Sequence, residues 1–123
     1  MSKITLTIII VSALLICAIT GLLIWWFQNR IKTHKEYYDE DKKQIKRIYY
    51  THKKIKCGEE RIYYPTGELN KIQNWSNNVK NGKFTVFYKS GKDYITGYYL
   101  DGKYKGEYIV YDMNGAILNK IQY

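Results

Sequence analysis

Glycines recur at a fixed spacing of 24 residues along the second half of the chain, and this periodicity constrains the fold more than any other feature. Two sets of three share the spacing: Gly58, Gly82 and Gly106, then Gly67, Gly91 and Gly115. Three further columns follow the same period: the aliphatic Ile62, Val86 and Val110, and the aromatic Tyr63, Phe87 and Tyr111, and Trp75, Tyr99 and Tyr123. A fixed period of this length is typical of repeat architectures.

Each unit has the pattern of a two-stranded β-hairpin. Residues 106–111 are rich in β-branched and aromatic residues, which favour strands. Asn114-Gly115 is a turn signal, residues 116–123 form the return strand, and Asp101-Gly102 marks a turn between units. A single hairpin is marginally stable in water, so neighbouring units must stack. The sequence predicts a mainly β fold of three antiparallel hairpin repeats over 58–123, and leaves open which face is buried.

These residues resemble the MORN-repeat variant family, the short bacterial hairpin repeats of YwqK-like antitoxins. The resemblance rests on Phe84, Phe87 and Ser90-Gly91, followed by residues 99–103, Tyr-Leu-Asp-Gly-Lys. The unit at Gly58 departs most, with Glu60 in place of the first aromatic residue and Asn78 in place of the connecting glycine. The resemblance implies a scaffold that binds proteins or membranes, and for some members an immunity partner of a toxin.

An uncharged run from Ile4 to Phe27 precedes the repeats. A helix of that length spans about 36 Å, enough to cross a hydrocarbon core of about 30 Å. Trp25, Trp26 and Phe27 close the run where aromatic residues gather at a membrane interface. We therefore expect residues 1–29 to be an N-terminal transmembrane anchor. The alternative is a cleaved signal peptide, for which the run is long and lacks a small-residue cleavage site.

Residues 30–57 are strongly basic: residues 28–57 hold ten Lys/Arg against four acids, whereas 58–123 hold nine against seven. The sequence predicts a juxtamembrane stalk over 30–57 that attracts anionic lipid headgroups. The candidate lipid-binding residues are Arg30, Lys32, Lys35, Lys42, Lys43, Lys46 and Arg47. One alternative is a solvated linker. Another is a degenerate first repeat, in which Tyr38 to Lys42 match Tyr111 to Gly115 with a slip of one residue.

The same asymmetry bears on sidedness. Lys3 stands alone before the apolar run, whereas many basic residues follow it. For a single-pass protein of the inner or plasma membrane, the positive-inside rule then places the C-terminal domain in the cytoplasm. An extracytoplasmic domain is the alternative, because a short basic N-terminus also suits a signal anchor.

No catalytic or metal-binding pattern stands out. Both histidines, His34 and His52, lie in the lysine-rich stretch and are expected to be solvated. The acids between 36 and 41 have flanking lysines and no calcium-loop glycine. We expect no enzyme activity, no cofactor and no metal. Nucleic-acid binding is unexpected too, because the repeat region carries little net positive charge.

Tyrosine-rich surfaces favour protein interfaces, and the chain has 14 tyrosines. We therefore predict a membrane-anchored, non-enzymatic module that binds a protein, in its sharpest form an antitoxin or immunity-like protein with a toxin as partner. The candidate binding residues form one aromatic set: Tyr63, Trp75, Phe87, Tyr99, Tyr111 and Tyr123. The alternative is a membrane-surface or cell-envelope scaffold that binds anionic lipid through the basic stalk.

Overall fold

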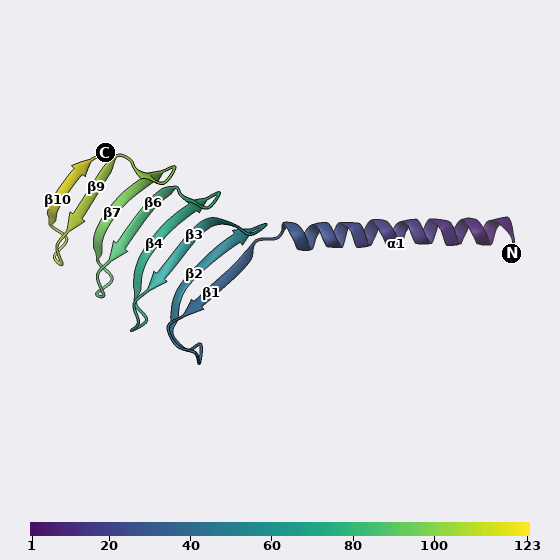
Figure 1. Cartoon of the computed structure of the whole chain (residues 1–123), viewed down its shortest axis with the longest axis horizontal. Coiled ribbons are helices and arrows are strands. Elements are labelled where there is room, and N and C mark those ends of the chain that lie inside the picture. Colours follow the sequence, from purple (N-terminus) through teal and green to yellow (C-terminus); the bar gives the residue numbers. More distant parts are fainter. The chain divides into compact units, whose positions relative to one another are not determined.

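The computed structural model describes all residues 1–123 and divides the chain into two compact units, Met1–Arg30 and Ile31–Tyr123 (Figure 1). The first unit is one helix, α1 (Lys3–Asn29), capped by the Ser2 hydroxyl, which accepts a hydrogen bond from the Thr5 amide at 3.2 Å. No residue of α1 is buried, and the helix is long and apolar enough to cross a membrane. It extends slightly beyond the predicted run at both ends.

The second unit is one antiparallel sheet, so the predicted mainly β class is confirmed. Its strands are β1 (Lys32–Tyr37), β2 (Ile45–His52), β3 (Ile55–Tyr63), β4 (Leu69–Ser76), β5 (Val79–Lys80), β6 (Gly82–Phe87), β7 (Asp93–Leu100), β8 (Lys103–Tyr104), β9 (Glu107–Tyr111) and β10 (Ile117–Gln122). The order is β1-β2-β3-β4-β6-β7-β9-β10, with β5 paired to β4 and β8 to β7. Consecutive hairpins therefore lie side by side (Figure 1).

Two-residue turns connect the strands at the end of the sheet where β1 begins, and we call them the proximal turns. They are Lys53-Lys54, Asn77-Asn78 and Asp101-Gly102, and all six residues have positive φ. Positive φ at both central residues is the signature of a type I′ turn, whose twist matches that of the flanking strands. The turn at 101–102 was predicted, and Asn77-Asn78 stands at the equivalent position 24 residues earlier. The Lys53-Lys54 turn was not predicted, because lysine carries no turn signal.

Longer loops connect the strands at the opposite end, and we call them the distal loops. In three of them the amide of the first residue donates to the carbonyl four residues later: Tyr64 to Glu68, Tyr88 to Lys92 and Asp112 to Ala116. A glycine with positive φ stands just before the end of each, at Gly67, Gly91 and Gly115. This glycine adopts the left-handed conformation that a three-residue hairpin loop requires.

Tyrosine hydroxyls connect successive distal loops. Tyr64 donates to the carbonyl of Phe87 and Tyr88 to that of Tyr111, both at 2.8 Å. Tyr38 makes the same bond, to the carbonyl of Tyr63, also at 2.8 Å. These bonds join neighbouring hairpins through their side chains, in addition to the backbone ladder between the strands.

The predicted boundary at 57/58 falls inside β3, and residues 32–52, predicted as a stalk or as a degenerate first repeat, form a hairpin of the sheet. The first distal loop runs from Tyr38 to Gln44 and is two residues longer than the others. The Asp39 carboxylate holds it by accepting from the amides of Lys43 and Gln44. Tyr38 thus matches Tyr64 and Asp112 by position in the loop, whereas the sequence pattern matched it to Tyr111.

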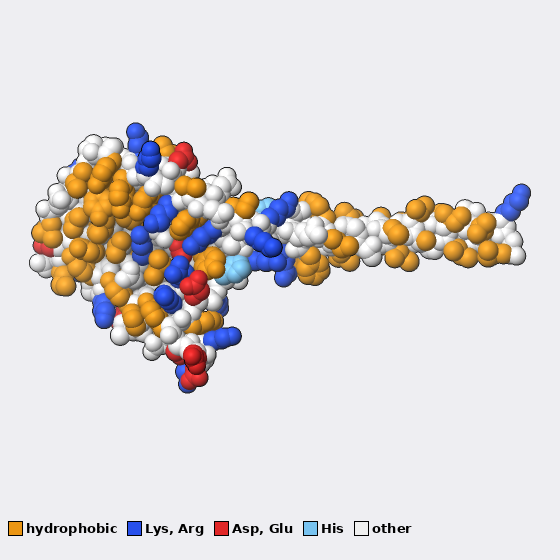
Figure 2. All heavy atoms as spheres, in the orientation of Figure 1, with side chains coloured by type: hydrophobic (Ala, Val, Ile, Leu, Met, Phe, Trp, Pro, Cys, Tyr) orange, Lys and Arg blue, Asp and Glu red, His pale blue; other side chains and the backbone are white.

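The small core lies on one face of the sheet, which we call the aromatic–lysine face. The five buried residues all belong to it: Thr51, Glu60, Gln73, Phe84 and Tyr99. Figure 2 shows hydrophobic side chains gathered over the C-terminal strands and Lys and Arg side chains over the middle of the sheet. Because a single layer covers its core with its own side chains only, long lysine stems and tyrosine rings perform the role of a second layer.

Candidate functional site

Glu60, on β3, is the most buried side chain of the sheet, with 1 % of its surface exposed. Its Oε1 accepts from Lys56 Nζ at 2.7 Å, and its Oε2 accepts from Gln73 Nε2 at 2.6 Å and from Trp75 Nε1 at 2.7 Å. Arg47 Nη1 lies 3.7 Å from Oε1. The carboxylate is thus satisfied by donors from β3 and β4, with the guanidinium on β2 as a further counter-charge, as a buried charge must be.

The electrostatics of this cluster favour the ionised carboxylate. Burial by itself would raise the pKa of Glu60, but the hydrogen bonds from Lys56, Gln73 and Trp75 outweigh it and hold the pKa below its ordinary value. The Lys56 ammonium also lies over two rings, 4.1 Å from the Trp75 centroid and 4.7 Å from that of Tyr49. Lys56 is therefore fixed between a carboxylate and an aromatic pair.

The next hairpin places different residues at the equivalent positions. The cross-strand pair Glu60–Gln73 is followed, 24 residues on, by Phe84–Gly97. Lys80 occupies the place of Lys56, but Phe84 stands where a carboxylate would be. The Lys80 ammonium lies 5.2 Å from the Tyr99 ring centroid and makes no ion pair.

Lys71, on β4, is a second cation of this region without a carboxylate in contact. Its ammonium lies 5.4 Å from the Phe84 ring centroid, on the aromatic–lysine face. Burial lowers the pKa of Lys71, and the neighbouring charge of Lys80 lowers it further, whereas Glu60 opposes the shift. Lys71 and Lys80 therefore form a pair of mutually repelling ammonium groups over an aromatic floor.

Five aromatic side chains cluster beside this pair, towards the C-terminal strands. Phe84 is 3 % exposed and lies 4.8, 5.9 and 6.1 Å, between ring centroids, from Tyr99, Tyr104 and Tyr108. Tyr104 also stacks on Tyr99 at 4.9 Å and lies 5.1 Å from Tyr123. Tyr104 and Tyr123 remain exposed. The cluster thus has a buried floor and an accessible rim.

The six predicted binding residues do not form one face. Trp75, Tyr99 and Tyr123 lie on the aromatic–lysine face, as their contacts with Glu60, Phe84 and Tyr104 show. Ile62, Val86 and Val110 share the aromatic–lysine face, because they pair across the strands with Lys71 or Ile95. Tyr63, Phe87 and Tyr111 follow them in the chain and therefore lie on the opposite face, because successive strand residues alternate sides. Their role in binding stays a prediction.

The seven predicted lipid-binding residues are also dispersed. Arg30 ends the helical unit, where its guanidinium lies 5.2 Å from the Phe27 ring centroid, and Lys32 begins β1. Lys35 lies within β1, Lys42 and Lys43 lie in the first distal loop, and Lys46 and Arg47 lie on β2. Arg47 Nε pairs with Glu36 Oε2 at 2.9 Å. Their binding to lipid headgroups stays a prediction.

Sequence reasoning missed the residues that make the cluster around Glu60. It recorded Glu60 only as a departure from an aromatic column. A sequence signal for the cluster was present in the column four residues before Glu60 in the repeat, which contains Lys56, Lys80 and Tyr104 at the same 24-residue spacing. His34 was expected to be solvated, but its Nε2 lies 2.7 Å from Thr51 Oγ1, on the same face.

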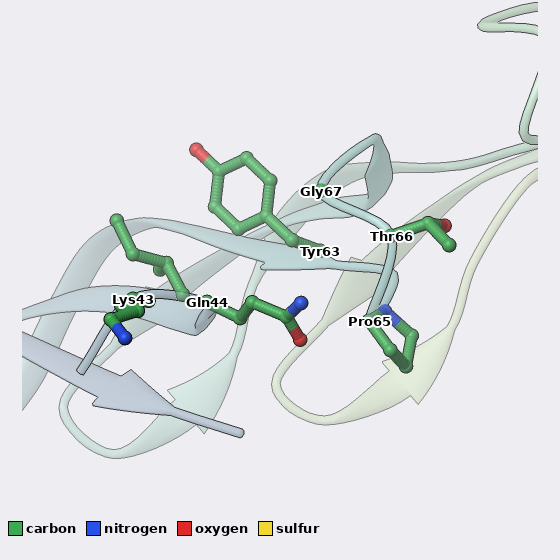
Figure 3. A pocket seen from close by; sticks show the side chains of 7 residues that line it. Lys43, Gln44, Tyr63, Pro65, Thr66 and Gly67 are labelled. Carbon is green, nitrogen blue, oxygen red and sulfur yellow. The ribbon is translucent and has the colours of Figure 1, made fainter. Parts of the chain in front are cut away.

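A groove of about 410 Å³ lies elsewhere, between the first two distal loops (Figure 3). Lys43, Gln44 and Ile45 line one side, and Tyr63 with residues 65–67 lines the other. Its ionisable groups are one lysine and one tyrosine, so it presents a mixed polar surface without a cluster of charges.

The chain matches no protein-family model, no curated protein and no solved structure. The resemblance to the MORN-repeat variant family therefore stays a prediction.

Proposed function

We propose that the chain is a membrane-anchored, non-enzymatic module that binds a protein partner through the aromatic–lysine face. The anchor is α1, whose apolar side chains are exposed all round, as in a helix surrounded by lipid. The binding unit is the sheet, which has no second layer over its aromatic side chains.

The observation that carries this proposal is the combination of an exposed tyrosine rim with two lysines that have no carboxylate partner. Tyrosine offers a large contact area at a low entropic cost and is enriched at interfaces. Cations held over aromatic rings are partly desolvated, which strengthens their interaction with an incoming group of opposite charge. A protein surface can satisfy both features at once.

A finer form of the proposal follows from the family resemblance: the partner is a toxin, and the chain is its immunity protein at the inner or plasma membrane. The excess of basic residues after α1 supports a cytoplasmic sheet. A reporter that is active only in the cytoplasm, fused after Tyr123, tests this sidedness, and an inactive fusion contradicts it.

Photo-crosslinking from two tyrosine positions tests whether the aromatic–lysine face binds a protein. Tyr104 lies on this face and is 41 % exposed, whereas Tyr98 lies on the opposite face and is 46 % exposed. Each is replaced by benzoylphenylalanine in the full chain, in its native cells. We expect a discrete protein adduct from position 104 and none from position 98, because only the former borders the proposed site.

The matched exposure of the two tyrosines controls for chance collision. Equal adducts from both positions, or an adduct from position 98 alone, would reject the aromatic–lysine face as the binding surface.

A second candidate function, a scaffold on anionic lipid, is favoured by the distribution of charge between the two ends of the sheet. The proximal turns carry Lys53 and Lys54 against a single acid, with Lys103 directly after the third turn, whereas the distal loops carry four lysines against five acids. Exposed Ile55, Val79 and Leu100 flank the proximal turns. Lysines interspersed with apolar side chains suit an anionic bilayer surface.

Two serine positions at opposite ends of the sheet test this second candidate. Ser76 ends β4 beside a proximal turn, and Ser90 lies in a distal loop. Ser76 is separated from β1, the strand that follows α1, by about 14 Å across the sheet. Each is replaced by a fluorophore-labelled cysteine in the full chain with Cys17 and Cys57 changed to serine. In bilayers that contain phosphatidylglycerol, we expect spin-labelled lipid headgroups to quench the label at 76 more than that at 90.

The contrast should shrink in phosphatidylcholine alone, at high salt, and in the K53Q/K54Q/K103Q variant, because each removes the attraction between lysines and headgroups. The same quenching at both positions in every bilayer would exclude a lipid-bound proximal edge.

A further inference from the structure

The hairpin of β3 and β4 shows how a carboxylate is held on the aromatic–lysine face. Glu60 receives Lys56 at 2.7 Å, and the Lys56 ammonium lies over the Trp75 ring at 4.1 Å. The cation is thus neutralised by an acid and packed on an aromatic ring at the same time. Charge-assisted hydrogen bonds of this kind are about twice as strong as neutral ones.

The next hairpin keeps the lysine and the ring but lacks the acid. Lys80 lies over Tyr99 at 5.2 Å and over Trp75 at 6.0 Å, and Phe84 replaces the carboxylate. Lys71 adds a second ammonium above Phe84. The one buried acid of this face is Glu60, and Lys56, Gln73 and Trp75 already occupy its oxygens.

We propose that Lys71 and Lys80 receive a carboxylate side chain from an acidic segment of the protein partner, which supplies the group that Phe84 replaces. This inference rests on the proposed protein-binding function and names the chemistry of its partner. The exposed rings of Tyr104 and Tyr123 lie beside the pair and would contact apolar residues next to the acid in that segment. The expected partner segment therefore combines glutamate or aspartate with large apolar residues.

A protein carboxylate fits the pair better than a nucleic acid does. Binding of a polynucleotide requires a track of cations along successive phosphates. Here the two free lysines adjoin a cluster whose other cations, Lys56 and Arg47, are paired with Glu60 and Glu36. The pair therefore suits one or two carboxylates.

The test uses the full chain in nanodiscs, with Trp25 and Trp26 changed to phenylalanine so that Trp75 is the only tryptophan. The probe is a synthetic peptide of alternating glutamate and leucine, and its control carries glutamine in place of glutamate. We expect saturable binding of the glutamate peptide, observed as a change in Trp75 fluorescence, because Lys80 lies next to that ring. Lys80→Gln and Lys71→Gln should each weaken binding about tenfold, a typical effect of losing one charge-assisted hydrogen bond.

Lys83→Gln, on the opposite face, is the matched control and should leave the affinity unchanged. Unchanged urea midpoints establish that each variant remains folded. Equal binding of the glutamine peptide, equal loss in Lys83→Gln, or stronger binding of a single-stranded oligonucleotide would overturn the inference. If the adduct from position 104 persists in the double variant K71Q/K80Q in cells, protein binding stands and the acidic-segment inference fails.

Discussion

Replacing Glu60 with alanine is expected to lower the free energy of unfolding of the sheet by about 3 kcal/mol or more. The change removes a carboxylate that is 1 % exposed and leaves the Lys56 ammonium, the Gln73 amide and the Trp75 indole N–H without their acceptor. Breaking one side of a buried ion pair costs more than the pair contributes, because the remaining charge stays desolvated. Urea unfolding of the full chain in nanodiscs, followed by circular dichroism of the strands, measures the difference.

The adjacent Glu59 provides the matched control. Its carboxylate pairs with Arg61 Nε at 2.6 Å, but both side chains are exposed on the opposite face. Surface pairs of this kind contribute at most about 1 kcal/mol. Glu59→Ala should therefore change the urea midpoint little. Equal losses in the two variants would show that the cluster around Glu60 does not stabilise the sheet.

The same carboxylate gives the stability of the sheet a defined dependence on pH. The pKa of Glu60 is lower in the folded sheet than in the unfolded chain, so folding favours the ionised form. Its contribution is complete above the ordinary carboxyl pKa, about 4.3, and is lost as the pH falls through the lowered folded-state value. Glu60→Gln should flatten this acid limb of the stability curve.

The class of the fold could be predicted from the sequence because turn chemistry and strand composition coincide in the last three units. Asp101-Gly102 and Asn114-Gly115 identify their turns by residue type alone. The first hairpin was only one of three interpretations of its segment, because its proximal turn is Lys53-Lys54 and its distal loop has two extra residues and lacks the glycine of the other distal loops. A charge-rich hairpin with these connections has the composition of a linker.

The candidate site was harder to predict because it depends on which side of the sheet each residue occupies and which side chains it meets on the neighbouring strands. Trp75 was selected for its aromatic ring, and the structure places it on this face with its indole N–H bound to Glu60. Tyr63 was selected for the same reason and lies on the other side. A periodic column fixes which residues are equivalent, but the side they occupy depends on the strand register and its bulges.

Gly97→Gln is expected to destabilise the sheet by about 2 to 3 kcal/mol, because Phe84 fills the space that any side chain at 97 needs. A Cβ atom at 97 would lie 2.6 Å from Phe84 Cε1 and 2.7 Å from Cζ, too close for real contacts. The equivalent pair in the preceding hairpin is Glu60–Gln73, in which both side chains are present and bonded to each other at 2.6 Å. The Phe84 ring therefore requires a glycine at 97, just as the Glu60 carboxylate is matched by the Gln73 amide.

This coupling predicts that Phe84→Glu partly rescues Gly97→Gln. Phe84→Glu alone removes a buried ring, a change that costs about 3 kcal/mol or more in a core. In the double variant, however, the new acid can accept from both the new amide and Lys80, and so reproduce the bonds that Glu60 makes with Gln73 and Lys56. We expect the double variant to lose about 1 to 3 kcal/mol less unfolding free energy than the sum of the losses in the two single variants. Urea midpoints of the four proteins complete the cycle. If the losses of stability add strictly, the pair at 84 and 97 cannot adopt the hydrogen-bonded arrangement of Glu60 and Gln73.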